Sequence, residues 1–492
     1  MIVNSSKEQK YSTLFNQNFN EEKNSLNLPH FNIGLEGIKY FNCSDLFTKV
    51  NLVTLKLNNN NLNKEAIYYL SEIRFLKHLR NLNLNNNQIE ADGIQFLTNS
   101  PIITELTSLA LSNTGMGDIG LKILSAWKFF PLLTHLDISY NNIKDTGIDY
   151  MSNNFELTSK LIYFNLNNNN IGTKGIKHFS SCNFLQNLKT LLLEKNSINT
   201  EGLKYFNECK FLTQLSYLDL KDNHIRSDGI KVLAECEFLY NLEHLFLKNN
   251  TIQKEGINNL YYAKWLGSIK TLDIHKTNIG EGGMKHLAKF KFLTQLVKLD
   301  LGENKIGTNG MRYISDFKFL ISLRSLDLRK NDIHEKGIKY LSYCKFLINL
   351  EELNLEGNEI GPEGIKLFFE CKFLSQMKYL NLQSNKIGNG VFKFLSPCKF
   401  FHKITYLNLS LNSIGDEGIK KISDCNYLKN LHTLCLNENN ITNDGLMYLN
   451  DCSFFSCLER IELKSNNLNK EHIKSLENYK FGQVKFVLEK DS

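Results

Sequence analysis

The chain has 492 residues, of which 42% are hydrophobic and 22% are charged, and its formal net charge is +7. This is the composition of a soluble globular protein and excludes a disordered or collagen-like chain. The first 27 residues contain no apolar run of signal-peptide length, and we find no transmembrane-length apolar segment anywhere in the sequence. We therefore expect a cytoplasmic protein, with the nucleus as the alternative.

Residues 1–27 are polar and mixed in charge, and we expect them to form a loosely ordered N-terminal arm. Residues 28–51 follow as a cap, because Ile33, Gly37 and Ile38 match the second half of the repeat described next, without its strand. A stack of repeats needs such a cap, since its first repeat would otherwise expose its apolar core.

A pattern of about 27 residues then repeats sixteen times over residues 52–472, and the copy that begins at Leu323 shows it clearly. Leu326 and Leu328 alternate with polar residues, which predicts a strand with one buried face. Gly337 opens a segment whose apolar residues, Leu341 among them, have helical spacing. One strand and one helix cannot bury their apolar faces alone, so the repeats are predicted to stack as a solenoid. Residues 473–492 are expected to close the other end, with Val484–Leu488 as one more short strand.

An Asn and a Gly recur in each repeat at nearly constant positions. The Asn amide can donate and accept at once, so it is predicted to bond the turn after each strand. Thr114 and Thr277 replace it, and we expect looser turns there. The Asn column is Asn60, Asn87, Asn141, Asn169, Asn196, Asn223, Asn250, Asn304, Asn331, Asn358, Asn385, Asn412, Asn439 and Asn466. The Gly is expected to allow a close backbone approach or a positive φ.

This pattern, L-x-x-L-x-L-x-x-N-x-I followed by a helix, resembles the leucine-rich repeat family, and within it the ribonuclease-inhibitor subclass. The resemblance covers roughly residues 28–488. It implies an α/β solenoid shaped as a right-handed horseshoe, with a parallel sheet on the concave face and α-helices on the convex face. We expect a single elongated domain and a monomer.

Eight of the 11 cysteines occupy one position of the repeat, seven residues after the Gly. Neighbouring helices lie about 8–10 Å apart, which is farther than a disulfide allows. We expect small, buried, reduced core residues, as in the cytosol. No C-x-x-C pair and no phosphate-binding loop are present, so we predict neither a metal nor a cofactor. The eight are Cys182, Cys209, Cys236, Cys344, Cys371, Cys398, Cys425 and Cys452.

The variable positions of the strands are the best candidates for function, because they are expected to project from the concave face without packing duty. An aromatic and apolar group occurs there, and an exposed apolar patch beside charges is typical of a protein interface. Its members are Tyr163, Leu192, Tyr217, His244 and Phe246, with Tyr379 and Tyr406 as a second group. Incidental exposure of single apolar residues is the alternative.

Beside it lie Asp219 and the acidic ridge, which we define as Asp273, Asp300 and Asp327 in three successive repeats. Like charges at sheet spacing repel one another, so the ridge is interpreted as a surface for basic residues of a partner. Alternatively, Asp is simply a soluble choice, compensated by Lys276, Lys298 and Arg329.

Basic residues recur two positions after the Gly and are predicted to lie on the outer, helical side. A nucleic acid or an anionic membrane could follow such a stripe. Acidic residues interleave and no nucleic-acid module is recognised, so both partners are disfavoured. The stripe comprises Lys122, Lys177, Lys204, Lys231, Lys285, Arg312, Lys339, Lys366 and Lys420.

No nucleophile with an associated base stands out, and His135, His244 and His275 are single residues in a polar column. We therefore predict a non-enzymatic scaffold that binds a protein partner through the concave face, the partner having a basic surface where it meets the ridge. The alternative is an activator of a small GTPase, because the Ran GTPase-activating proteins resemble this subclass. Members of that kind usually end in an acidic tract, which the C-terminal sequence here lacks.

Overall fold

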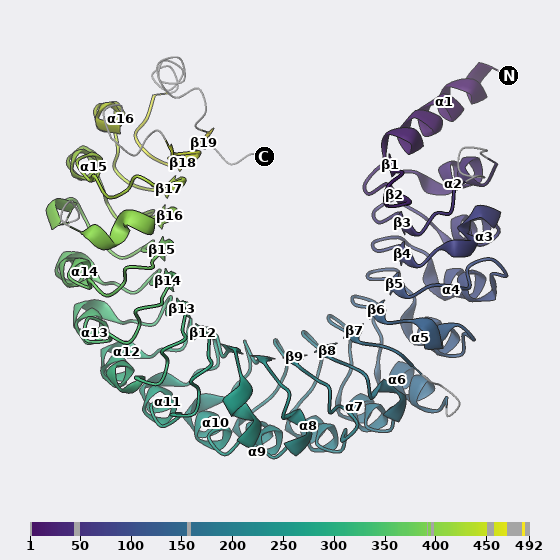
Figure 1. Ribbon diagram of the computed structural model, residues 1–492, viewed down its shortest axis with the longest axis horizontal. Coiled ribbons are helices and arrows are strands. Elements are labelled where there is room, and N and C mark those ends of the chain that lie inside the picture. Colours follow the sequence, from purple (N-terminus) through teal and green to yellow (C-terminus); the bar gives the residue numbers. More distant parts are fainter. Residues whose placement is uncertain are drawn as a thin grey trace. The chain divides into compact units, whose positions relative to one another are not determined.

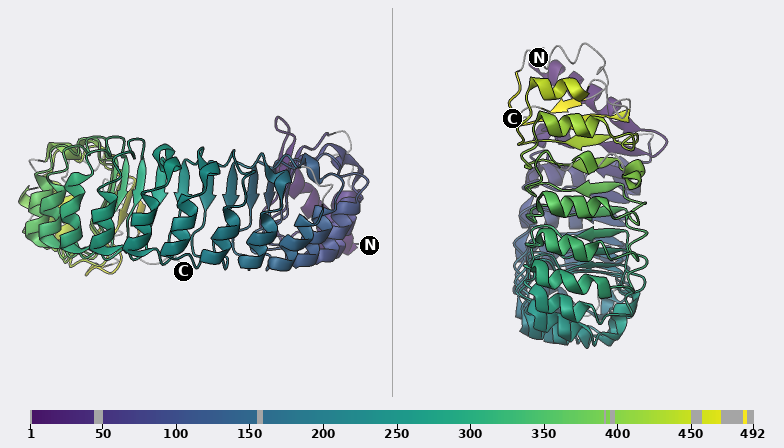
Figure 2. Two further views of the ribbon diagram at one scale, coloured as in Figure 1. Left: turned by 90° about the horizontal axis from the view of Figure 1, so that it is seen from below. Right: turned by 90° about the vertical axis from the view of Figure 1, so that its left-hand side faces the viewer.

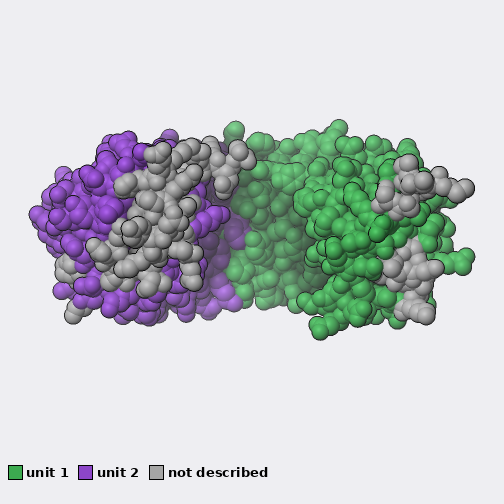
Figure 3. Space-filling view, turned by 90° about the horizontal axis from the view of Figure 1, so that it is seen from above, with its two compact units in different colours: residues 1–245 green, residues 246–492 purple. Residues whose placement is uncertain are grey.

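The computed structural model describes residues 2–43, 50–154, 159–390, 392–394, 398–449, 457–469 and 485–487. Its contacts divide the chain into two compact units, residues 1–245 and residues 246–492 (Figure 3). The two units are built in the same way, from short strands that alternate with short helices. None of the described helices combines the length and apolar character that a bilayer span requires.

Unit 1 holds the first nine strands, and a tenth spans the boundary. The strands are β1 (Phe19–Asn20), β2 (Ser25–Asn27), β3 (Thr54–Lys56), β4 (Asn81–Asn83), β5 (Ser108–Ala110), β6 (His135–Asp137), β7 (Tyr163–Asn165), β8 (Thr190–Leu192), β9 (Tyr217–Asp219) and β10 (His244–Phe246). The α-helices are α1 (Ile2–Gln17), α2 (Gly34–Cys43), α3 (Lys64–Ser71), α4 (Glu90–Asn99), α5 (Gly117–Ser125), α6 (Asp145–Ser152), α7 (Thr173–Phe179), α8 (Thr200–Phe206) and α9 (Ser227–Ala234). Short 3₁₀ helices follow some of them, at Arg74–His78, Phe130–Leu132, Asn183–Leu185 and Glu237–Leu239.

Unit 2 continues the alternation. Its strands are β11 (Thr271–Asp273), β12 (Lys298–Asp300), β13 (Ser325–Asp327), β14 (Glu352–Asn354), β15 (Tyr379–Asn381), β16 (Tyr406–Asn408), β17 (Thr433–Cys435), β18 (Arg460–Glu462) and β19 (Lys485–Val487). Its α-helices are α10 (Gln253–Leu260), α11 (Gly280–Leu287), α12 (Gly307–Met311), α13 (His334–Leu341), α14 (Gly361–Phe369), α15 (Asp416–Ser423) and α16 (Asn443–Leu449). The 3₁₀ helices are Lys264–Ser268, Arg312–Asp316, Phe392–Phe394 and Lys399–Lys403.

β1 and β2 pair antiparallel, whereas β2 to β9 in unit 1 and β11 to β19 in unit 2 pair in parallel, with one repeat set directly against the next. Leu299 pairs with Leu326, and Leu326 pairs with Leu353, so each middle residue meets its equivalent. Because side chains alternate along a strand, the middle leucine enters the core and its two neighbours point outward. Within each unit the strands line the inner side of a curved stack, and the helices form a row on the other side (Figures 1 and 2). The predicted α/β solenoid with a parallel sheet is confirmed.

The Asn column forms the expected network, and Asn331 shows it. Its Oδ1 accepts hydrogen bonds from the backbone N–H groups of Asn304, at 2.8 Å, and Ile306, at 3.3 Å. Its Nδ2 donates to the carbonyl oxygens of Leu301 in the preceding repeat, at 2.9 Å, and Leu328 in its own repeat, at 3.0 Å. The side chain is fully buried, so each of these bonds satisfies a group that water cannot reach. The column is therefore structural.

Thr114 and Thr277 are as buried as the asparagines they replace. The Thr114 hydroxyl lies 2.9 Å from the carbonyl oxygen of Leu111, and its backbone N–H donates to Asn141 Oδ1. The Thr277 hydroxyl likewise lies 2.6 Å from the carbonyl oxygen of Ile274, and the looser turns stay a prediction. The substitution costs the bond to the preceding repeat, because a hydroxyl is shorter than an amide.

The Gly column is explained by close packing. A Cβ on Gly364 would lie 2.5 Å from Ile360 Cγ2, and a Cβ on Gly120 would lie 2.5 Å from Met116 Cβ. Neither glycine has a positive φ. Of the two reasons offered by the sequence, the close approach is correct.

The expectation of a loosely ordered arm over residues 1–27 is wrong. Residues 2–17 form α1, and Phe15 is buried against Phe41 of α2, with ring centroids 5.2 Å apart. The cap also has a strand, because β2 pairs in parallel with β3 and places Leu26 beside Leu55. The pattern Leu26-x-Leu28 indicates this strand, but its spacing to the next copy is 29 residues and it lacks the Asn.

At the other end, the predicted last strand is confirmed, because β19 pairs in parallel with β18. The rest of the expected C-terminal cap lies outside the described residues, as does Cys452. The seven other cysteines of the column are buried and form no disulfide. Burial raises the pKa of the Cys236 and Cys344 thiols to about 12, so they stay protonated and pack as small apolar groups.

Candidate functional site

The strand face of each unit consists of the outward side chains of its strands and of the residue two positions after each strand. The second outward position of each strand has a structural role. This corrects the expectation from the sequence that such positions have none. An Asp or Asn there accepts a hydrogen bond through Oδ1 from the backbone N–H two residues later, as Asp137 does from Ser139 at 3.0 Å. This bond explains why the column is rich in Asp and Asn. It recurs at Asn83, Asn165, Asp219, Asp273, Asp300, Asp327, Asn354, Asn381 and Asn408.

Leu192 and Phe246 are half-buried exceptions in this column, on unit 1 and unit 2 respectively. At Leu192 the backbone N–H that would need the bond, that of Glu194, donates instead to Asn167 Oδ1 of the preceding repeat, at 2.7 Å. Position 192 is thereby released from the structural role. An apolar residue can stand there without leaving a buried polar group unsatisfied.

Around Leu192, unit 1 carries two pairs of aromatic rings. The His135 and Tyr163 rings stack with centroids 5.9 Å apart and planes 24° apart. The Tyr217 and His244 rings lie 5.5 Å apart at 40°. Three predicted site residues, Tyr163, Tyr217 and His244, are thus brought together with Leu192 on one surface, and His135 joins them.

Asp219 does not offer a free charge. It is buried, and its carboxylate lies 3.1 Å from Lys221 Nζ, which also lies 3.2 Å from Glu194. Burial raises the pKa of Asp219 despite the bonds from Lys221. These three residues form a closed charge cluster at one side of the aromatic pairs.

In unit 2 the register sets Asp273, Asp300 and Asp327 side by side, as the sequence predicts. The structure adds two cationic or titratable partners. His275, which is 3% exposed, places Nδ1 3.3 Å from Asp300 Oδ1. Arg329 lies 3.6 Å from Asp327 and 4.0 Å from Asp300. The expected compensation by Arg329 is correct.

The carboxyl groups of the ridge differ in acidity. Burial, and then the charge of Asp300, raise the pKa of Asp273 to about 6. Burial pushes the pKa of Asp300 upward, but the bonds from His275 and Gly302 and the charge of Arg329 outweigh it and leave the pKa lowered. Burial and the charge of Asp300 raise the pKa of Asp327. Asp273 therefore ionises at a higher pH than an ordinary aspartate, whereas Asp300 ionises at a lower pH.

Gly302 is part of this arrangement. A Cβ at this position would lie 2.5 Å from His275 Nδ1, so only glycine leaves room for the imidazole beneath the strand face. Gly302 is visible in the sequence, but its role follows only once the structure shows that His275 of the preceding repeat lies against it.

Tyr379 and Tyr406, the second predicted group, stand on adjacent strands and stack on each other. Their ring centroids are 4.4 Å apart and their planes differ by 8°. The Cys435 thiol donates to the Tyr406 hydroxyl at 3.6 Å. Burial raises the pKa of both phenols and, to about 11, that of Cys435, so this group is a packed cluster.

Eight stretches of the chain match a family model described as a leucine rich repeat. They are residues 75–97, 131–152, 212–234, 293–315, 320–342, 347–369, 402–423 and 427–449. The protein is a leucine-rich repeat protein. No curated protein sequence matches the chain.

Solved structures of leucine-rich repeat proteins resemble it in fold. TLR13 in complex with ssRNA13 is 18% identical with a TM-score of 0.52, over 89% of this chain and 62% of that one. An internalin of Listeria monocytogenes is 18% identical, with a TM-score of 0.44 and coverage of 82% and 95%. A repeat protein of Leptospira interrogans is 21% identical, with a TM-score of 0.44 and coverage of 89% and 90%. At these identities the likeness concerns the fold alone, and the ribonuclease-inhibitor subclass stays a prediction.

The outer side of the leucine-rich repeats is less open than the basic stripe suggests. Lys122 Nζ lies 4.9 Å from the centre of the Tyr150 ring, one repeat farther on, and Lys420 lies 5.3 Å from that of Tyr448. Such contacts hold the ammonium groups against aromatic faces. The stripe thus takes part in packing between repeats, which its regular spacing conceals.

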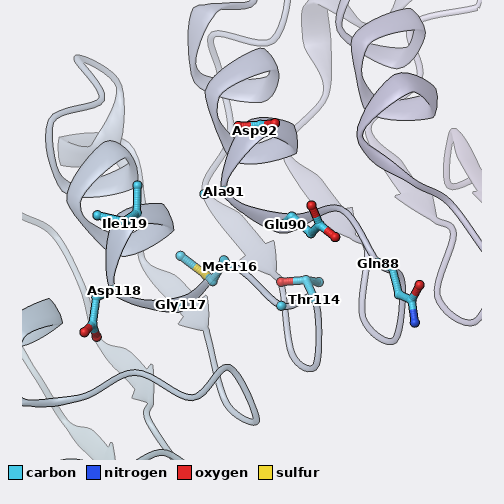
Figure 4. A pocket seen from close by; sticks show the side chains of 10 residues that line it. Gln88, Glu90, Ala91, Asp92, Thr114, Met116, Gly117, Asp118 and Ile119 are labelled. Carbon is cyan, nitrogen blue, oxygen red and sulfur yellow. The ribbon is translucent and has the colours of Figure 1, made fainter.

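A hollow of about 610 Å³ opens at the edge of the repeats between α4 and α5. Glu90, Asp92 and Asp118 line it, and Figure 4 shows their carboxylates at separate points around it. Asp92 pairs with Lys64 at 2.7 Å, and Asp118 accepts a bond from the Lys144 N–H at 2.7 Å. No group of three or more His, Cys, Asp or Glu suited to a metal ion occurs among the residues that the structure describes.

Proposed function

We propose that this leucine-rich repeat protein is a non-catalytic scaffold whose strand face in unit 1 binds a protein partner. The binding surface is the aromatic patch, defined as His135, Tyr163, Leu192, Tyr217 and His244. The observation that carries the proposal is Leu192, a half-exposed apolar side chain at a position released from backbone capping by Asn167. It stands between two His–Tyr pairs. Buried aromatic anchors supply most of the energy of protein interfaces.

The acidic ridge is a weaker candidate for the contact. Arg329 already pairs with Asp300 and Asp327, and His275 contacts Asp300, so a partner's cation would compete with an existing network. Tyr379 and Tyr406 of unit 2 stack on each other and are left out of the proposed contact, as is Phe246. A monomer in the cytoplasm is the proposed state of the free protein.

A protein is favoured over a nucleic acid by the charges on this face. Along β4–β9, the outward positions and the residue two positions after each strand carry one cation, Lys221, which pairs with Asp219 and Glu194. Phosphate backbones are bound through several Lys or Arg contacts. The RNA recorded with TLR13 therefore does not extend to this surface by analogy.

Affinity capture with the full chain tests the proposal. We expect Tyr163→Ala combined with Leu192→Ser to lose a partner that wild type and a Tyr379→Ala control retain. Equal retention by all three would place the contact elsewhere and overturn the proposal. The GTPase-activator alternative has no support from the comparisons, and multiple-turnover stimulation of GTP hydrolysis by a captured GTPase would revive it.

A further inference from the structure

The strand register of unit 1 sets one short residue between the two tyrosines of the aromatic patch. Thr190 pairs with Tyr163 on one side and with Tyr217 on the other. Each tyrosine is backed on its far side by a histidine, His135 or His244. The order across the sheet is therefore His, Tyr, Thr, Tyr, His. We call the space above Thr190, between Tyr163 and Tyr217, the tyrosine slot.

The width of the slot follows from strand spacing. Tyrosines on adjacent strands close onto each other, as Tyr379 and Tyr406 do at 4.4 Å. Tyr163 and Tyr217 are two strands apart, which is about 10 Å. A group midway is then about 5 Å from each ring, within the roughly 6 Å reach of a cation–π contact.

The surroundings of the slot favour a cation with an apolar stem. Leu192 follows Thr190 on β8 and offers an apolar surface. Asp137 lies on β6, and its Oδ1 accepts bonds from the Ser139 N–H and hydroxyl. It forms no ion pair with any residue in the described part of the chain, unlike Asp219, Asp300 and Asp327. Asp137 lies two strands from Thr190, on the other side of Tyr163, and after burial it contributes to the raised pKa of that phenol, so its charge reaches the Tyr163 wall of the slot.

We propose that the tyrosine slot receives the guanidinium group of an arginine side chain of the protein partner. The inference rests on the proposed function and names the partner's chemistry. The planar guanidinium stacks between the two rings, its methylene stem lies on Leu192, and Asp137 attracts it from β6 at longer range, across Tyr163. A neutral aromatic ring would lack the positive charge that the two ring faces and Asp137 attract. A lysine ammonium group carries the same charge but is not planar, so it cannot stack between the two rings.

The same slot can be closed by one substitution. Thr190→Tyr would fill it with a third ring, and the register already holds tyrosine at this position in β7, β9, β15 and β16. The fold therefore accommodates the change, and a thermal melt checks this. Thr190→Ser leaves the slot open and is the matched control. Lys189→Ala removes the exposed cation that precedes Thr190 and should tighten binding about twofold.

The test uses N-acetyl-arginine amide as the probe and saturation-transfer NMR of the full chain as the readout. We expect transfer to the Cδ protons from wild type and Thr190→Ser. We expect at least a fivefold loss with Thr190→Tyr, with Asp137→Asn, or when N-acetyl-citrulline amide, which is planar but neutral, replaces the probe. Equal transfer to citrulline, stronger transfer to N-acetyl-phenylalanine amide, or indifference to Thr190→Tyr would overturn the slot.

The partner distinguishes this failure from failure of the proposed function. A captured partner that is lost by Tyr163→Ala but kept by Thr190→Tyr leaves the scaffold proposal standing and overturns the arginine. A partner that Thr190→Tyr and Asp137→Asn both release, while Thr190→Ser keeps it, supports both. Arginine binding by the slot with no loss of the partner in any of these variants overturns the scaffold proposal at this face.

Discussion

The strand faces of the two units each carry two tyrosines, and the pairs differ by one repeat in spacing. Tyr379 and Tyr406 in unit 2 are adjacent and stack at 4.4 Å, so each ring covers the other. Tyr163 and Tyr217 in unit 1 stand on either side of Thr190. The same residue type thus forms a closed cluster in one unit and the walls of the proposed slot in the other. In a repeat fold, the spacing between like residues decides whether they pack or bind.

The carboxylates of the two units also differ in whether they are bonded within the fold. In unit 2 the acidic ridge is folded into a network with His275 and Arg329, and Gly302 makes room for it. In unit 1 Asp137 caps the backbone but has no ion-pair partner among the described residues. The acidic ridge has more carboxylates than the aromatic patch, but those carboxylates are bonded within the fold. On this comparison we propose that the ridge serves stability and that the aromatic patch serves recognition.

Removing His275 should break the unit 2 network with the largest effect. His275→Ala leaves a cavity and takes a hydrogen-bond partner from Asp300, so we expect a loss of about 3 kcal/mol in the free energy of unfolding. The two tryptophans lie in different units, so urea unfolding can be followed by Trp265 in a Trp127→Phe background. His135→Ala, followed by Trp127 in a Trp265→Phe background, should cost below about 0.5 kcal/mol. Equal losses would contradict the contrast.

When binding is measured instead of stability, the larger effect should come from the tyrosines of unit 1. Tyr163→Ala with Tyr217→Ala removes both walls of the slot, and we expect the partner's Kd to rise about 30- to 100-fold. Tyr379→Ala with Tyr406→Ala should change it less than about fivefold. Calorimetric titration of the captured partner gives both values. A larger effect from the unit 2 pair would reverse the assignment.

The ridge should show its internal strain through pH. The pKa of Asp273 is about 6 in the folded state and 3.8 in its absence, so the folded chain holds the proton more firmly. Stability from this group therefore falls as the pH rises from about 4 to 6. Asp273→Asn keeps the backbone cap and should be more stable than wild type by about 1–2 kcal/mol above pH 6, with no gain below pH 4. A gain that is constant with pH would show that Asp273 is not strained.

The smallest effect concerns the Asn column, in which the two units should behave alike. Thr114→Asn restores the side-chain N–H to the Leu84 carbonyl, and Thr277→Asn does the same in unit 2. Each should stabilise its unit by about 0.5–1 kcal/mol. The two unit-specific tryptophan signals measure this. Destabilisation of either unit would mean that the hydroxyl packing at that turn is worth more than the amide bond.

The sequence predicts what is periodic. The strands, the Asn network and the buried cysteines repeat at one spacing, so the pattern alone is enough to place them. The N-terminal helix is not periodic: Tyr11 and Phe15 anchor α1, and from Lys7 to Gln17 the only other apolar residue is Leu14. Two anchoring residues in one short helix do not form a pattern that distinguishes α1 from a loosely ordered arm.

The site is predictable only in part, for a related reason. The columns place Tyr163, Leu192 and Tyr217 on one face, but they do not say which neighbours neutralise a charge. The pairing of His275 with Asp300 joins residues 25 positions apart and depends on Gly302. Thr190 is visible in its column as a small polar residue. Its place between the walls of the slot follows only from the structure, in which the adjacent rings of Tyr379 and Tyr406 lie 4.4 Å apart and leave no space between them.

Site-specific photo-cross-linking tests the central claim most directly. A benzoylphenylalanine replaces Leu192 in unit 1 or Asn354 beside the ridge in unit 2, and each full-length variant is irradiated in an extract of the cells that produce the protein. The account predicts one partner cross-linked from position 192, absent from position 354 and lost when Thr190→Tyr is added. A partner cross-linked from position 354 and not from 192 would contradict it.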